Sequence, residues 1–122
     1  MTRTLQERLA EAARVAVYYN YITIAQQIIS FLKKIRETSQ KTFIWMEYSE
    51  AELLVKLPGN MDDPKTGKRL NSDQIRAQQI ERRVESLKIL EKTMITNKQK
   101  EVLDPDLIYE GCVLIWNTAL PF

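Results

Sequence analysis

The chain has 122 residues, which suits one domain with one modest core, and its formal net charge at pH 7 is only +2. Neither half of the sequence is strongly basic, which argues against a nucleic-acid-binding protein, and no apolar run is long enough to cross a bilayer. Gly (3) and Pro (4) are scarce while good helix formers dominate, so the composition predicts an all-α protein.

The first 37 residues predict two helices. Apolar residues recur at helical spacing over 4–18, and Thr4 with Glu7 has the spacing of a capping box at the start. Asn20 indicates a break, because it follows poor helix formers and tolerates turn geometry. A regular apolar stripe then predicts a second helix over 21–37.

The middle of the chain predicts a third helix and one long loop. Polar residues at 38–42 offer N-cap side chains for a helix over 42–57, and Pro58 followed by Gly59 ends it. Its expected buried side consists of Phe43, Ile44, Tyr48, Ala51, Leu54, Val55 and Leu57. The loop over 59–72 contains an Asp-Pro-Lys-Thr-Gly segment that is typical of a tight turn.

The C-terminal half predicts two further helices. Ser72 or Asp73 is expected to cap a long, charged helix over 73–97, whose apolar stripe is sparse at its start. An Asp-Pro pair at 104–105 then predicts a helix over 105–118. This last helix is apolar nearly all round, which is typical of a helix buried on every side, although no sixth helix follows to cover it.

Five helices with mostly short connections favour antiparallel hairpins. The spacing of the first and third helices is near the repeat length of hairpin solenoids, so we expect an α-solenoid, tetratricopeptide-like array over 1–122. A compact helical bundle is the alternative.

The residue types argue against an enzyme. The chain has no histidine and one cysteine, which removes His-based catalysis and zinc sites that need His or several thiolates. The segment Lys65–Lys68 lacks the first glycine and the preceding strand of a phosphate loop, and Asp62 with Asp63 lacks the spacing of a calcium loop. We therefore expect no catalytic residue, no cofactor, no metal and no small-molecule substrate.

The remaining interpretation is protein binding. The candidate contact residues lie on the long charged helix and at the C-terminal end: Arg82, Arg83, Lys88, Lys92, Trp116, Leu120 and Phe122. Tyr18, Tyr19 and Tyr21 are interpreted as helix packing or a partner contact, because no basic stripe accompanies them. Trp45 and Trp116 are most simply core anchors, although tryptophan is also common at interface hot spots.

Residues 1–7 lack the apolar stretch of a secretory signal, and a lone cysteine fits a reducing compartment. These features predict a cytoplasmic or cytoskeletal setting. Cys112 lies in an apolar run, which favours a buried structural thiol.

The segment 104–121 contains the pattern G-C-x-x-x-W-N-x-x-L-P over Gly111–Pro121, after the long charged segment 71–96. Together they resemble large helical-repeat cilia- and flagella-associated proteins. The resemblance implies a non-catalytic segment of a very large tetratricopeptide-like scaffold in the axonemal central apparatus, which supports ciliary motility. Its partners would be axonemal complex subunits or neighbouring repeats of a longer chain.

A second hypothesis needs no longer chain. A small, self-contained helical adaptor would form a homodimer through its last helix and bury Trp116 and Phe122 against a second copy. A small helical enzyme that uses Lys or Glu is a third alternative.

Overall fold

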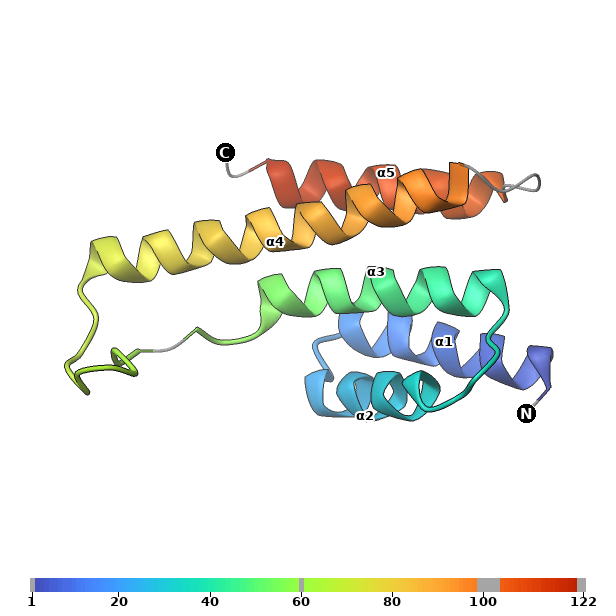
Figure 1. Cartoon of the computed structure of the whole chain (residues 1–122), viewed down its shortest axis with the longest axis horizontal. Helices are drawn as coiled ribbons and strands as arrows, with labels where there is room; N and C mark the ends of the chain where they lie inside the picture. The colour runs from blue at the N-terminus through green and yellow to red at the C-terminus, as the bar shows by residue number, and fades with distance from the viewer. Residues whose placement is uncertain (1, 60, 99–103, 121–122) are drawn as a thin grey trace.

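The computed structural model describes residues 2–59, 61–98 and 104–120, which form an all-helical protein, as the composition predicts. The helices are α1 (Arg3–Tyr18), α2 (Ile22–Lys33), α3 (Gln40–Lys56), α4 (Ser72–Lys98) and α5 (Pro105–Ala119). Figure 1 shows them stacked in order, with α1 and α2 at one edge, α3 and α4 in the middle and α5 at the opposite edge.

The stacking follows the order of the chain. Among the described residues, each helix packs only on helices one or two positions away: α1 on α2 and α3, α3 on α2, α4 and α5, and α4 on α5. Consecutive helices run in opposite directions, so α1, α3 and α5 are parallel to one another (Figure 1). The short connections at 19–21 and 34–39 enforce these antiparallel pairs.

Both ends of α1 carry capping motifs. Thr2, and not Thr4, is the N-cap, and its side chain accepts a hydrogen bond from the Leu5 amide. At the other end, Asn20 has a φ of 65°, and the Tyr21 amide donates to the Ala16 carbonyl at 2.8 Å. This is a Schellman ending, in which Asn takes the left-handed position, and it confirms the predicted break.

Helix α2 ends at Lys33, about one turn before the predicted end at 37. The amides of Lys34 and Ile35 bond three residues back, which tightens and ends the helix. The buried side chain of Gln6 then holds the connection, because its amide group donates to the Glu37 carbonyl and accepts from the Ser39 amide. Ser39 in turn caps α3.

The loop after α3 folds on itself. Asp62 and Arg69 form an isolated β-bridge, and the Gly67 amide donates to the Asp63 carbonyl at 2.8 Å. The Asp63 side chain accepts from the Lys65 amide, and Gly67 has a φ of 69°, a conformation that glycine adopts without steric cost. The predicted tight turn is therefore present.

Asn71, and not Ser72 or Asp73, caps α4. Its side chain accepts from the Gln74 amide while the Gln74 side chain accepts from the Asn71 amide, which is a reciprocal capping box. Asp104 caps α5 as predicted, and Pro105 stands at the first helical position.

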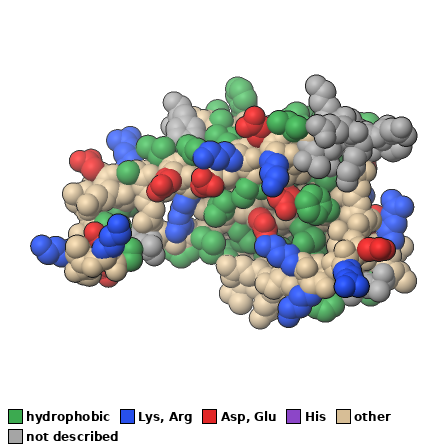
Figure 2. All heavy atoms as spheres, viewed as in Figure 1, with side chains coloured by type: hydrophobic (Ala, Val, Ile, Leu, Met, Phe, Trp, Pro, Cys, Tyr) green, Lys and Arg blue, Asp and Glu red, His purple; other side chains and the backbone are tan. Residues whose placement is uncertain are grey.

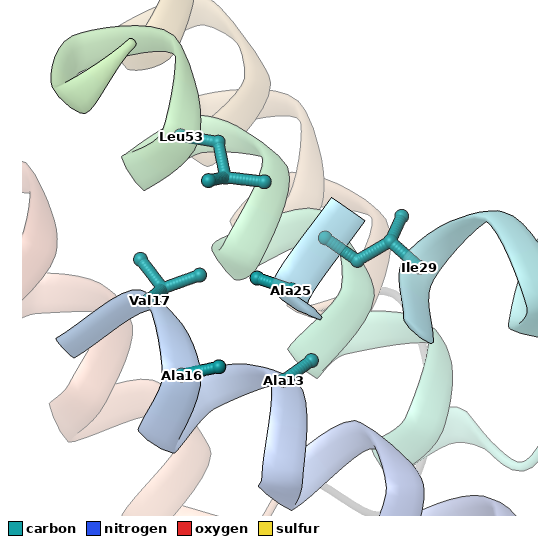
Figure 3. Packing of buried hydrophobic residues seen from close by; sticks show 6 residues of the cluster. All are labelled: Ala13, Ala16, Val17, Ala25, Ile29 and Leu53. Carbon is teal, nitrogen blue, oxygen red and sulfur yellow. The ribbon is translucent and has the colours of Figure 1, made fainter. Parts of the chain in front are cut away.

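Small residues let α1, α2 and α3 approach closely. Figure 3 shows six side chains from these helices, of which three are alanines, converging on one cluster: Ala13, Ala16, Val17, Ala25, Ile29 and Leu53. On the other side of α3, Ile44, Tyr48 and Ala51 pack against α4 and α5.

Because α3 lies between two helix pairs, it is buried on two opposite sides instead of the single side that periodicity predicts. Met46 and Leu53 face α1 and α2, while Phe43, expected in the core, is 40% exposed. The two buried sides explain why one amphipathic stripe does not describe this helix.

Candidate protein-binding surface

One face of α5 carries a strip of uncovered apolar side chains. The strip residues are spaced at four, three and four positions, which places them on one side of a helix: Tyr109, Val113, Trp116 and Leu120. Tyr109 is 73% exposed and Trp116 is 67% exposed. Cys112 borders the strip and is also exposed.

The opposite face of α5 is buried against α3 and α4 through Leu107, Gly111, Leu114 and Thr118. The expectation that α5 is buried on every side is therefore wrong for the described residues, as is the expectation of a buried thiol at Cys112. Trp116 is likewise no core anchor. The physical reason is that only two of the described helices lie against α5, and both contact the same side.

Polar contacts from α3 fix the position of α5. The Tyr48 hydroxyl donates to the Leu107 carbonyl at 2.8 Å in the buried interface. The indole nitrogen of Trp45 donates to Glu110 Oε2 at 2.9 Å. Burial raises the pKa of Tyr48 to about 12, and the nearby Glu110 carboxylate adds to the shift, so the hydroxyl stays protonated and able to donate.

Arg14 of α1 joins three helices through ion pairs. Its Nε lies 2.7 Å from Glu110 of α5, and its Nη2 pairs with Glu52 of α3. The guanidinium also lies over the Tyr48 ring, with Cζ 6.0 Å from the ring centroid. Since the Arg14 side chain is only 13% exposed, water screens these charges weakly. This network aligns the three parallel helices on one side of the stack.

The four basic candidates on α4 have different surroundings. Arg82 donates to the Leu57 carbonyl at 2.6 Å, at the end of α3, and Arg83 donates to the Thr118 carbonyl at 3.2 Å, near the end of α5. Cations at helix C-termini satisfy unpaired carbonyls and the helix dipole, so both guanidinium groups have structural partners. Lys88 and Lys92 are exposed, and Lys88 pairs with Glu85.

The other candidates differ in placement. Trp116 and Leu120 lie together in the strip, 67% and 60% exposed, whereas Phe122 lies outside the described residues. Tyr18, Tyr19 and Tyr21 are all exposed, and the first two rings stack edge to face at 5.0 Å between centroids. They lie at the turn between α1 and α2, at the far edge of the stack from α5.

A second row of exposed apolar residues runs along α4. Ile80, Val84 and Ile95 share one side of the helix by their spacing and are each at least 38% exposed. In Figure 2, hydrophobic side chains gather along the upper edge of the molecule, over α4 and α5, among basic and acidic ones. The apolar stripe that periodicity predicts for this helix does not by itself separate buried residues from exposed ones.

A groove of about 450 Å³ lies over α3, between α2 and α4. Its apolar floor includes Ile29, Leu53 and Ile89, and Lys33 pairs with Glu50 at its wall. Nearby, Glu47 has a raised pKa, mainly because burial penalises its charged form and also because Glu50 is close. The charged and apolar side chains of this region occupy the centre of the face in Figure 2.

The described residues form neither a metal site nor a membrane-spanning helix. No group of three or more His, Cys, Asp or Glu side chains there is arranged to hold a metal ion. No described helix is long and apolar enough to cross a membrane.

Comparison with models of known protein families, with curated proteins and with solved structures found no match to this chain. The candidate surface is therefore defined by the exposure and spacing of the α5 side chains. Sequence analysis identified Trp116 and Leu120 but missed Tyr109, Cys112 and Val113 as surface residues, although a helical projection of 105–120 places all five on one side.

Proposed function

We propose that this chain is a non-catalytic segment of a helical scaffold that binds other protein surfaces, with its helices in a tetratricopeptide-like array of hairpins. The observation that supports the proposal is the uncovered strip on α5, at the edge of a stack whose other helix interfaces are apolar. Contiguous exposed apolar side chains with aromatic residues are typical of protein-binding surfaces.

The stacking order supports the array. In hairpin solenoids each helix contacts only near neighbours in the sequence, so the stack is open at both ends. The described helices have this property, because α1 does not pack on α4 or α5, although the Arg14 side chain reaches Glu110 of α5. A compact bundle, by contrast, would pack distant helices against each other around one closed core.

The pairing of the acidic side chains supports a non-catalytic role. Glu50 pairs with Lys33, and Glu52 and Glu110 both pair with Arg14. Carboxylates held by cations in this way join helices, and the sequence contains no histidine to act as a general base near pH 7.

The cellular setting is a separate proposal. We propose a place in the axoneme of a cilium or flagellum, supporting motility, and the support is the resemblance of residues 104–121 to helical-repeat ciliary proteins. The test is the location of the tagged chain in ciliated cells. Enrichment along the axoneme is expected, and a uniform cytoplasmic signal would refute it.

A homodimerising adaptor is the second candidate function. The same strip favours it, since Trp116 could bury its ring against a second copy around a two-fold axis. The two candidate functions differ in what covers the strip. In the adaptor it is a second copy of the chain, and in the scaffold it is a helix of different sequence.

The experiment is the solution mass of the 122-residue chain by light scattering behind a sizing column. For the scaffold we expect strip-dependent, concentration-dependent association without one defined size, which Trp116→Ser reduces. Tyr21→Ser is the matched control, because Tyr21 is 62% exposed but lies outside the strip. A discrete dimer that Trp116→Ser abolishes would favour the adaptor. If the chain has the mass of a monomer and neither substitution changes that mass, both candidate functions are contradicted.

A further inference from the structure

We infer that the strip on α5 binds one amphipathic helix that runs antiparallel to α5 and lies beside α4. This helix would take the place on α5 that α4 takes on α3 and that α2 takes on α1. The inference rests on the proposed function, because it names the occupant of the same surface.

The positions of α1, α2, α4 and α5 around α3 are the reference for the surroundings of α5. Glu52 and Lys56 face α1, since they contact Arg14 and the Val17 carbonyl. Glu50 faces α2 through Lys33. The Ala51 carbonyl accepts from Ser86 of α4, and Tyr48 faces α5. Around α3 the order is therefore α1, α2, α4, α5, with the two even-numbered helices adjacent.

The same order can be followed around α5, which is parallel to α3 (Figure 1). Glu110 marks the side of α3 and α1, because it contacts Trp45 and Arg14. The buried face follows, where Gly111 lies against Met94 of α4, and the half-buried Ile115, packed against the cluster that includes Leu90 of α4, comes next. Because each residue of a helix advances by 100° around the axis, the next side of α5 carries Cys112, Trp116 and Tyr109.

That position corresponds to the side of α3 that α4 covers. A partner helix that lies on α5 as α4 lies on α3 would therefore cover Cys112 and Trp116 first. The outer side of Val113 would stay open to a second helix, placed as α5 is placed on α3.

The chemistry of the occupant follows from the strip. From Tyr109 to Leu120 the strip spans eleven steps of about 1.5 Å, so the partner helix needs about three turns. Its contact face must be apolar at i, i+3, i+4 and i+7 spacing, the pattern by which an amphipathic helix occupies an apolar groove. Its direction is antiparallel to α5, as α2 is to α1 and α4 to α3.

The test uses the whole chain and a displayed library of helical peptides with apolar residues at that spacing. Peptides are selected on the natural chain and counter-selected on Trp116→Ser. Cys112, the only cysteine, then reports where the selected peptides bind. We expect the peptide to slow alkylation of Cys112 at least tenfold. In the matched variant Cys112→Ser with Val113→Cys, we expect much weaker protection of the thiol.

Direction is measured with a nitroxide at either end of the selected peptide. An antiparallel helix broadens the amide signals near Thr118 when the label is at the peptide N-terminus, and those near Asp106 when it is at the C-terminus. The reverse broadening pattern would overturn the inference. So would a Cys112 thiol that stays reactive in a complex that Trp116→Ser abolishes; in both cases the strip would still be a binding surface. Failure to select any Trp116-dependent helix also overturns it. If Trp116→Ser in addition leaves the solution mass unchanged, the proposed function fails with it.

Discussion

At the residue scale, Tyr48 illustrates how a single side chain serves both packing and polar contact. It is 1% exposed, packs with Ile44 and Leu107, and donates its hydroxyl proton to the Leu107 carbonyl. The buried hydroxyl has a partner, so it avoids the cost of an unpaired polar group. Tyr48 thereby joins α3 to the first turn of α5.

We expect Tyr48 to ionise at higher pH than an ordinary tyrosine, since burial raises its pKa to about 12. The stability that the neutral hydroxyl contributes is present below pH 10 and is lost as the pH rises through about 12, because the unfolded chain releases the proton first. An alkaline titration of phenolate absorbance checks this. Tyr48→Phe should remove the last step only; loss of an earlier step would contradict the assignment.

The same variant should lower the free energy of unfolding at neutral pH by about 1–2 kcal/mol, since the Leu107 carbonyl loses its buried donor. Chemical denaturation measures the change. Tyr109→Phe is the control, because Tyr109 is 73% exposed and its loss of a hydroxyl should change the stability little. Equal effects of the two variants would refute a special role for Tyr48.

At the element scale, helix ends and ion pairs decide where each helix begins and how it is aligned. The cap of α4 is Asn71, which bonds reciprocally with Gln74. Asn71→Ala should therefore cost about 1 kcal/mol and speed amide exchange in the first turn of α4. Ser72→Ala should have little effect, although the sequence predicts Ser72 or Asp73 as the cap. A larger effect at Ser72 would show that the helix begins one residue later.

The alignment of α1, α3 and α5 depends on Arg14. Arg14→Ala leaves the carboxylates of Glu52 and Glu110 without their cation in a partly buried site, so we expect a loss of about 3 kcal/mol in chemical denaturation. The control is Arg3→Ala, whose ion pair with Glu7 involves an arginine that is 79% exposed and should cost about 0.5 kcal/mol or less. Similar losses would mean that Arg14 acts as a surface charge.

At the scale of the whole molecule, the loop 57–71 divides the stack into a three-helix part and a two-helix part. Lys65, Lys68 and Arg69 are exposed in this loop, so trypsin should cleave there before it cleaves the helices. The pieces should remain together on a sizing column, because Leu90 and Ser86 of α4 are buried against α3. Separation of the pieces, identified by mass spectrometry, would contradict this.

The open stack explains why apolar surface remains at its edges. A helix in the middle, such as α3, has neighbours on two opposite sides and is buried on both. Helix α5 has described neighbours on one side only, and its strip is left for another surface. The same open arrangement that makes hairpin arrays extendable thus produces the candidate binding site.

The helices and most of their ends could be predicted from the sequence alone, because periodicity, caps and turn residues are local signals. Asn20, Asp104 and the turn that ends at Gly67 each act within a few residues and appear as expected. For the cap of α4, sequence reasoning named Ser72 or Asp73 and missed Asn71, because a capping box depends on which two residues bond to each other.

Only the tertiary structure decided which apolar residues are covered. Trp45 and Trp116 look alike in the sequence, yet Trp45 lies partly buried with its indole bonded to Glu110, while Trp116 is exposed. Likewise Arg82 and Arg83 look like surface charges until the C-terminal ends of α3 and α5 meet them. Burial and pairing depend on neighbours that are distant in the chain, and a pattern along one helix does not contain their positions.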